Sequence, residues 1–248
     1  MRRLAIIVSG AAMLLWQAGI ASADGGYSGA VSFVRGQSVT SEAASAVYIF
    51  NSVDVSRGRL RVTATLPLVS QETIVLVVPT TQSPSWNGGL GDPTLRADVR
   101  VAGGGGRPWS LSVGGAVKFP VADVDDGLGS GEYDGTVGVT LLTGRGRHSF
   151  LLDVSYWLVG DMPDAPQRDV PAVYAGYAAI LDGGRRWSAI LAIASAGSIV
   201  EGLDPPTQLS VGILRALGSG AGLGATVGIG LTESASDFSI SASWRIGF

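Results

Sequence analysis

The chain has no cysteine and only one histidine, His148, among its 248 residues. Without cysteine it forms no disulfide bond and carries no lipid-modified cysteine at its N-terminus. One imidazole without thiolates offers too few ligands for a zinc site. Serine hydrolases need a histidine beside the serine and a carboxylate that orients the histidine, and no carboxylate is placed to orient His148. We therefore predict no metal, no cofactor and no enzymatic activity.

Charge and long apolar runs are scarce as well. Charged residues make up 15% of the chain and hydrophobic residues 46%, with a mean hydropathy of +0.34. After residue 23 no apolar run reaches the roughly 20 residues that a membrane helix needs. The formal net charge is −3, and an acidic chain lacks the basic face that a nucleic-acid partner requires. The chain therefore needs a way other than membrane helices to shield its many apolar residues.

The N-terminal segment 1–23 has the organisation of a secretory signal peptide. Arg2 and Arg3 precede an apolar run, and Ala-Ser-Ala at 21–23 supplies the small residues of a cleavage site. The apolar run is roughly 16 residues long, against the roughly 20 needed to span hydrocarbon, so a permanent anchor is the less favoured alternative. We predict export, cleavage of the signal peptide 1–23, and a mature domain over 24–248.

The mature region alternates apolar and polar residues with the period of two that is typical of β-strands. Counted from the C-terminus, strands are predicted near 236–248, 221–232, 206–217, 185–197, 169–181, 147–159, 132–143, 108–119, 93–102, 58–68, 46–55 and 27–35. A closed barrel pairs every backbone group and turns alternate side chains to the lipid. The predicted fold is an all-β transmembrane antiparallel up-and-down β-barrel of about twelve strands.

Short and long connections alternate along the chain. The short, glycine-rich connections are 56–57, 103–107, 144–146, 182–184 and 218–220, and the long ones are 70–92, 121–131, 160–169 and 198–205. Bacterial barrels have short periplasmic turns and long outer loops. The sequence thus predicts a bacterial outer-membrane protein in contact with membrane lipid and lipopolysaccharide. Two features fit less well. The connection at 233–235 should be long and is short. In the strand near 46–55, either assignment of the two faces leaves Tyr48 or Phe50 on an unfavourable side, so we expect a β-bulge there.

Inward-facing charges are the first group of candidate functional residues. A basic side chain on the lipid face costs about 2–4 kcal/mol at the bilayer midplane, so charges within strands are expected to point into the lumen. The lumen-lining candidates are Arg61, Arg96, Asp98, Arg100, Lys118, Asp134 and Asp153. Lys118 and Asp134 are expected to lie on adjacent strands near the outer end and to line a constriction. Alternatively, charges of both signs simply pair across a crowded lumen.

The longest connection holds the second group of candidates. Its apolar stretch 74–78, with Ile74, Leu76 and Val78 as the candidate residues, either folds over the mouth as an apolar receptor or extends a strand above the membrane. A third alternative makes it a membrane strand and frees 27–45 as a periplasmic arm or plug. The remaining mouth candidates are Gly89, Gly91 and Asp92. There the loop re-enters the wall, and glycine is expected to supply backbone freedom.

The chain ends in the sequence SASWRIGF, whose apolar residues alternate up to a terminal phenylalanine. This pattern resembles the C-terminal signature by which outer-membrane proteins are recognised for barrel assembly. Trp244, Ile246 and Phe248 are therefore the candidate assembly signal, and the barrel-assembly machinery is the expected partner.

Three glycine-rich motifs carry a narrower resemblance. They are Gly-Leu-Gly-Asp at 89–92, Gly-Ala-Val-Lys-Phe-Pro at 115–120, and Gly-Leu-Gly-Ser-Gly at 127–131 followed by Asp134. In order and spacing the chain from about residue 60 onwards resembles the outer-membrane family associated with the meta-pathway of phenol degradation. The resemblance implies a twelve-stranded barrel that transports hydrophobic or aromatic compounds, and it transfers no catalytic residue.

Strand number limits the width of the lumen. Eight strands leave an interior that side chains fill and sixteen leave an aqueous channel, so about twelve predict a narrow or occluded lumen. The predicted function is a channel that passes small hydrophobic or aromatic molecules by diffusion. The alternative is a structural or adhesin-like barrel with a closed lumen, whose loops bind lipopolysaccharide or another surface.

Overall fold

The computed structural model describes residues 24–36, 44–73, 85–161, 167–184, 186–218 and 220–248, and all regular structure in these residues is β-strand. The strands are β1 (Gly25–Gly36), β2 (Ala44–Arg57), β3 (Leu60–Thr73), β4 (Ser85–Leu90), β5 (Thr94–Gly103), β6 (Trp109–Lys118), β7 (Asp134–Arg145), β8 (His148–Leu158), β9 (Val170–Ile180), β10 (Trp187–Ala196), β11 (Thr207–Gly218), β12 (Ala221–Gly230) and β13 (Phe238–Gly247). Within the described ranges, no helix has the length and apolar character to cross a membrane.

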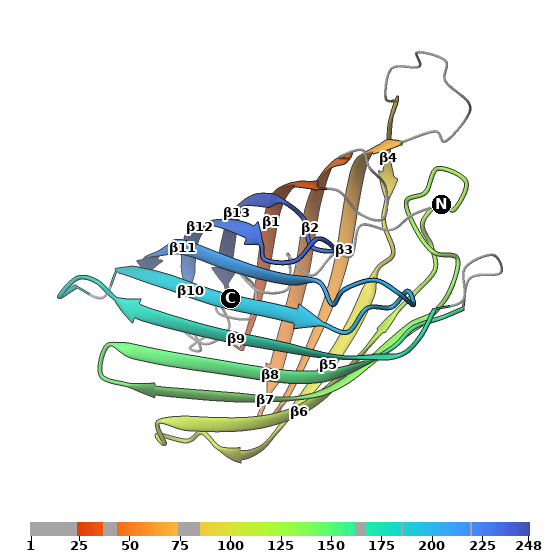
Figure 1. Ribbon diagram of the computed structural model, residues 1–248. Helices are drawn as coiled ribbons and strands as arrows, with labels where there is room; N and C mark the ends of the chain where they lie inside the picture. Colours follow the sequence, from red (N-terminus) through yellow and green to blue (C-terminus); the bar gives the residue numbers. More distant parts are fainter. Residues whose placement is uncertain (1–23, 37–43, 74–84, 162–166, 185, 219) are drawn as a thin grey trace.

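The strands close into a barrel (Figure 1). Strands that are neighbours in sequence pair antiparallel, except β4 and β5, and β13 closes the ring on β1. β4 and β5 occupy one position in the wall, because β3 pairs with β4 through 68–73 and with β5 through 60–65. The sheet of 13 strands is therefore a 12-strand barrel, which confirms the predicted fold. Because β1 lies in the wall between β2 and β13, the alternative in which 27–45 forms a plug is wrong for the described residues of that segment.

The two faces of the wall follow the predicted alternation. In β13 the apolar residues Phe238, Ile240 and Ile246 are 39%, 52% and 56% exposed, whereas Ser239 and Arg245 on the opposite face are 2% and 3% exposed. A band of outward apolar side chains suits lipid, and the buried polar face turns to the lumen. The same parity runs through the neighbouring strands, because the ladders keep Cα partners in register.

Two local predictions are corrected by the register. The expected bulge near Tyr48 and Phe50 is absent, since β2 pairs without interruption with both β1 and β3. Register shifts occur instead in β5, between Arg100 and Ala102, and in β11, between Ala216 and Gly218. The predicted loop 70–92 also contains wall structure, because β3 continues to Thr73 and β4 pairs with that extension.

The connections divide between the two ends of the barrel. The turns β2–β3, β5–β6, β7–β8, β9–β10 and β11–β12 lie at one end, called here the short-turn end, which is on the left and lower left in Figure 1. The connections after β1, β3, β6, β8, β10 and β12 lie at the other, called the long-loop end. The connection between β12 and β13 runs over 231–237 and is longer than the predicted 233–235.

Candidate functional site

A network of charged side chains lines the inner face of the wall from β13 to β8, and we call it the charged belt. It consists of Asp54, Arg61, Arg96, Asp98, Asp153 and Arg245. Arg245 on β13 donates two hydrogen bonds to the carboxylate of Asp54 on β2, one of them 3.1 Å long. Arg61 on β3 donates to the same carboxylate at 3.0 Å. Asp54 and Arg245 are 2% and 3% exposed, so their charges depend on each other for the solvation that water no longer supplies.

Arg245 reaches Asp54 across an intervening strand. Gly26 of β1 lies between them, and a Cβ added there would stand 2.5 Å from Nη2 of Arg245. Any larger residue at this position would push the guanidinium away from its partner. Gly26 of β1 therefore leaves the space through which the ion pair joins β2 to β13.

The second half of the belt centres on Arg96 of β5. Its guanidinium donates to Asp98 Oδ1 at 2.8 Å and lies 3.7 Å from Oδ2 of Asp153 on β8. Thr140 of β7 donates to the same Asp153 oxygen at 2.6 Å. The guanidinium thus bridges over the two intervening strands β6 and β7. This ion pair therefore passes over the inner faces of β6 and β7 and links strands that are not neighbours.

The two halves of the belt meet in the β3–β5 ladder, where Arg61 and Asp98 are direct Cα partners. Together they run around the lumen from β13 to β8. Sequence reasoning found Arg61, Arg96, Asp98 and Asp153 but missed Asp54 and Arg245. Asp54 lies in the strand whose faces could not be assigned from the sequence. Arg245 lies near the end of β13, where a charge on the lipid face costs little, so alternation alone does not require it to face the lumen.

The opposite side of the lumen is apolar, and we call it the apolar wall. Its residues, contributed by β7 to β11, are Leu142, Leu151, Tyr174, Ala178, Ile190, Ala192, Ala194 and Leu214. Among them, Leu151, Ile190 and Ala192 are 5–6% exposed. The sequence analysis did not single them out. A signal was nevertheless present, because residues 187–196 are mostly apolar on both faces, which is unexpected for a strand with a polar lumen side.

The long-loop end holds a second group of charges. Lys118 Nζ lies 2.6 Å from Oδ2 of Asp134 and 3.2 Å from Oδ2 of Asp92, and it donates a short hydrogen bond to Ser130 Oγ. Lys118 and Asp134 are direct partners in the β6–β7 ladder, as the sequence analysis expected. The addition of Asp92, from the break between β4 and β5, was not foreseen. The lysine is paired with two carboxylates in the described structure.

Asp92 also holds the connection 119–133 between β6 and β7. Its carboxylate accepts hydrogen bonds from the backbone N–H groups of Val121 at 3.1 Å, Ala122 at 3.0 Å and Ser130 at 3.4 Å. The side chain of Gln71 on β3 donates to the carbonyl of Gly127 at 2.7 Å. These contacts draw both arms of the connection onto the mouth of the barrel.

The tip of this connection packs into an apolar cluster at the mouth. Leu128 contacts a cluster formed by Val34, Ala46, Tyr48 and Val69, which Phe50 also joins. We call these residues the mouth cluster. The rings of Tyr48 and Phe50 stack with centroids 6.0 Å apart. Both aromatic residues therefore face the lumen, which resolves the uncertainty that the sequence left in β2.

Gly89 and Gly91 have a different role from the expected backbone freedom. Neither has a positive φ. A Cβ at Gly89 would stand 2.8 Å from Cδ1 of Leu128, and one at Gly91 would stand 2.9 Å from Cγ2 of Val69. The two glycines are small so that the connection and the mouth cluster can approach the wall closely.

The remaining sequence candidates are dispersed. Arg100 lies at the short-turn end and donates to the carbonyl of Gly58 at 3.3 Å. Ile74, Leu76 and Val78 lie outside the described residues. In β13 and after it, Trp244 packs over Gly29 of β1, while Ile246 and Phe248 are 56% and 69% exposed on the lipid face.

No protein-family model matches the chain, and no curated protein matches its sequence. Solved structures do match. An outer-membrane channel from Pseudomonas putida F1 superposes with a TM-score of 0.70 at 13% identity, over 91% of this chain and 96% of that one. The CymD monoaromatic hydrocarbon channel gives 0.55 at 11% identity over 100% and 95% of the two chains. The β domain of the Bordetella autotransporter BrkA gives 0.60 at 14% identity over 92% and 100%. At these identities the similarity establishes the barrel fold, and membership of the phenol-degradation family stays a prediction.

Proposed function

We propose that the protein is an outer-membrane channel through which small hydrophobic or aromatic molecules diffuse without a cofactor. The observation that carries this proposal is the apolar wall inside the lumen. The interior of an outer-membrane barrel is ordinarily polar, because alternation sends apolar residues to the lipid and polar residues inward. Apolar side chains from β7 to β11 pack against one another on the inner face. An apolar solute that passes between them exchanges one apolar contact for another and buries no unpaired polar group.

The charged belt supports the same proposal. Its carboxylates accept hydrogen bonds from the arginines of the belt itself, so the belt is electrically compensated from within. A polar solute that binds the belt would have to break ion pairs between its arginines and carboxylates. An apolar solute breaks no ion pair and can pass along the apolar wall. The mouth cluster, where Leu128 packs at the long-loop end, is a matching apolar surface at the entrance.

The surroundings follow from the same proposal. The short-turn end lies in the periplasm and the long-loop end outside, in an outer membrane of phospholipid and lipopolysaccharide. Residues 1–23 are a signal peptide removed on export, and Trp244, Ile246 and Phe248 form the signal read by the barrel-assembly machinery. Likeness in fold to a monoaromatic hydrocarbon channel supports the substrate class.

The second candidate function is a structural or surface-binding barrel whose lumen stays closed. Two observations favour it. The pair between Arg96 and Asp153 passes over the inner faces of β6 and β7, and an autotransporter β domain is among the structures with a similar fold. In this case the acidic connections of the long-loop end, rather than the lumen, would carry the activity.

Uptake of a radiolabelled monoaromatic hydrocarbon into liposomes separates the two functions. The refolded wild-type chain should accelerate uptake over empty liposomes. Two variants of the apolar wall, Ala192→Asn and Ala192→Leu, introduce side chains of similar size and opposite polarity. If the wall guides apolar solutes, the asparagine variant should lower uptake more than the leucine variant, with folding of each checked by heat-modifiable mobility on gels. Uptake equal to that of empty liposomes, from folded wild-type protein, would favour the closed barrel.

A further inference from the structure

The outer face of the barrel carries an apolar groove with a volume of about 440 Å³ over strands β7 to β11. Its centre is Ala175 of β9, whose Cα partners are Leu152 on β8 and Ile193 on β10. A methyl side chain between two larger ones leaves a depression in the wall. Leu152 and Ile193 are 41% and 42% exposed on the lipid side and form its flanks.

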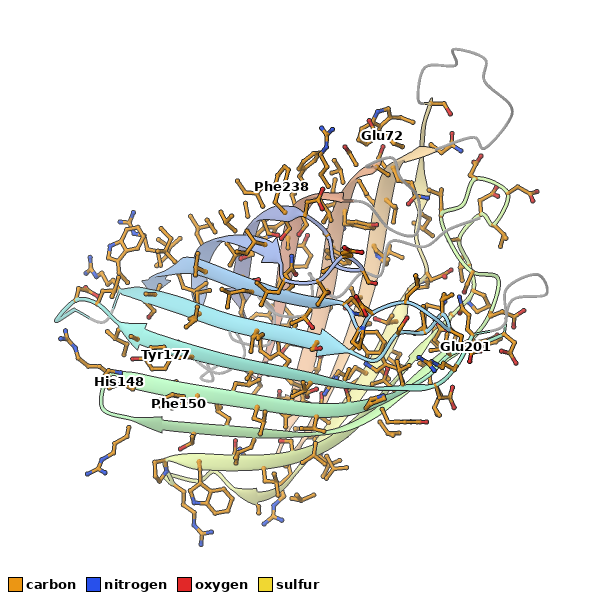
Figure 2. The ribbon with its side chains drawn as sticks, in the orientation of Figure 1. Glu72, His148, Phe150, Tyr177, Glu201 and Phe238 are labelled. Carbon is orange, nitrogen blue, oxygen red and sulfur yellow. The ribbon has the colours of Figure 1, made fainter. Side chains whose placement is uncertain are left out.

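An aromatic group forms one end of the groove. In the next outward row towards the short-turn end, Phe150 is the partner of Tyr177, with ring centroids 4.9 Å apart. His148 Nδ1 lies 2.6 Å from the Tyr177 hydroxyl, and their rings stack at 5.9 Å. Figure 2 shows the three labelled side chains together near the turn between β7 and β8. The hydrogen bond and the stacking hold Tyr177 in place, so this end of the groove has a defined shape.

Basic residues lie immediately beyond the aromatic group. Arg145 is the register partner of His148, and Arg147 occupies the turn between them; both side chains are exposed. The carboxylate of Asp182, in the turn between β9 and β10, attracts the charge of Arg147. The same carboxylate accepts hydrogen bonds from the backbone N–H groups of Trp187 and Arg186, which together with the charge of Arg147 lower the pKa of Asp182. Arg147 is therefore partly compensated, and Arg145 is the stronger site for an anion.

The charge of this rim is part of a wider asymmetry. Among the described residues, the short-turn end carries Arg57, Arg59, Arg100, Arg107, Arg145, Arg147, Arg186 and Arg215 against the acids Asp24 and Asp182. The described connections of the long-loop end are acidic. They carry Arg168 against Asp92, Asp123, Asp125, Asp126, Glu132, Asp161, Asp169, Glu201, Asp204, Glu233 and Asp237. In Figure 2, nitrogen-tipped side chains gather at the end marked by His148, and oxygen-tipped ones gather towards Glu201. An anionic partner is therefore expected at the short-turn end.

We propose that the groove over Ala175 binds an anionic phospholipid of the periplasmic leaflet. One acyl chain lies along the groove between Leu152 and Ile193, and the phosphate pairs with Arg145, assisted by Arg147. The assignment to the periplasmic leaflet rests on the orientation given under Proposed function, and it does not depend on which solute the channel passes. Lipopolysaccharide belongs to the other leaflet and would meet the acidic end.

A second copy of the chain fits this face less well. Copies in one membrane share their orientation, so a two-fold contact through the groove would bring the same surface of both copies together at the same depth. Arg145 and Arg147 of one copy would then approach those of the other. Like charges repel, whereas a phosphate between them attracts both.

Native mass spectrometry of the refolded full chain in detergent tests the proposal, with dipalmitoyl phosphatidylglycerol and dipalmitoyl phosphatidylcholine as probes. Wild-type protein should bind the anionic lipid more tightly. The variant R145Q should weaken phosphatidylglycerol binding by about fivefold, and R145Q/R147Q should weaken it further, with phosphatidylcholine binding nearly unchanged in both. R107Q is the matched control, because it removes an exposed arginine from another turn of the same rim.

A second pair of variants tests the groove. Ala175→Leu fills the depression and should weaken both lipids, whereas Ala225→Leu adds the same side chain to the lipid face of β12, outside the groove lining. Equal affinity of wild-type protein for the two lipids would overturn the proposal, as would R107Q acting as strongly as R145Q/R147Q. A dimer peak that Ala175→Leu abolishes would assign the groove to a second copy. None of these readouts involves transport, so they fail or succeed separately from the channel function.

Discussion

At the scale of single residues, Asp54 binds two arginines on the inner face of the wall, and water is excluded from Asp54 and Arg245. It is 2% exposed and bonds to Arg245 and Arg61. A buried ion pair gives little net stability over an apolar pair of the same shape, but a buried charge that has lost its partner is costly. Asp54 is therefore more important for what its removal would leave behind than for the energy of the pair itself.

Replacing Asp54 with leucine should lower the free energy of unfolding by about 3–5 kcal/mol, because the buried guanidinium of Arg245 loses its partner. Adding Arg245→Met to Asp54→Leu removes the orphaned charge and should restore most of the loss. Urea unfolding of each variant in lipid vesicles, followed by tryptophan fluorescence, measures the difference. If the double variant is as unstable as the sum of two independent losses, the two side chains do not act as a pair.

Two glycines illustrate a related effect of single residues. Gly26 leaves room for Arg245, and Gly114 on β6 leaves room for the carboxylate of Asp98, which a Cβ there would meet. At both positions a charged side chain of a neighbouring strand occupies the space that a Cβ would take. The belt therefore depends on the absence of side chains on β1 and β6 as much as on the presence of charges elsewhere.

At the scale of elements, the connection 119–133 is tied to the break between β4 and β5. Asp92 lies at that break, and its carboxylate accepts hydrogen bonds from the backbone N–H groups of Val121, Ala122 and Ser130. The break between β4 and β5 thus supplies the residue that holds the connection between β6 and β7. Leu128 at the tip covers the mouth cluster.

Asp92→Ala should release this connection from the mouth. The expected results are faster cleavage within 119–133 by an added protease and a higher rate of aromatic uptake into liposomes, because three backbone hydrogen bonds and the contact with Lys118 are lost. Asp123→Ala is the matched control. Asp123 lies in the same connection, and its carboxylate accepts hydrogen bonds from the nearby N–H groups of Asp125 and Asp126. Equal protease sensitivity of the two variants would argue against the anchoring role of Asp92.

The last strand makes its own prediction about assembly. Phe248 is 69% exposed, and its N–H donates to the carbonyl of Gly25 at 3.0 Å. Deleting Phe248 should lower the heat-modifiable fraction in outer membranes, since the terminal aromatic residue is the proposed assembly signal. Phe238→Ala removes an aromatic residue from the same face at the other end of β13 and should assemble normally. Normal assembly of the truncated chain would refute the role given to the terminus.

At the scale of the whole molecule, the barrel divides its lumen into a charged side and an apolar side. The charged belt runs over β13, β2, β3, β5 and β8, and the apolar wall over β7 to β11. Both sides belong to a closed ring of 12 strands, a number between those that give a filled interior and those that give an aqueous channel. Under the proposed channel function, this division would favour apolar solutes over a steady flow of ions.

Single-channel recording in a planar bilayer tests this division. Folded wild-type protein should show little steady conductance, because the belt charges are paired among themselves. A sixteen-stranded porin in the same bilayer serves as the positive control for insertion and recording. A steady, ohmic conductance from the wild-type chain would mean an open aqueous lumen and would move the substrate class towards small polar solutes.

The sequence by itself determined that the chain forms a barrel, that short and long connections lie at opposite ends, and which residues of most strands face the lipid. These properties are local: alternate residues of a strand point to opposite faces, and lipid penalises charge on one of them. In β13 the parity of Phe238 to Phe248 was readable without any partner strand. The lumen and lipid faces of β2 could not be assigned in this way, because both contain apolar or aromatic residues. Only the pairing of β2 with β1 and β3 shows which face turns to the lumen.

Tertiary structure alone decided which charges meet and where the apolar side chains gather. Arg245 and Asp54 are 191 residues apart in sequence, and Arg96 contacts Asp153 across two strands. Such contacts depend on closure, register and the small residues of the strands between, none of which is a local property. The groove over Ala175 is of the same kind, because a depression in the wall exists only when three strands are set side by side.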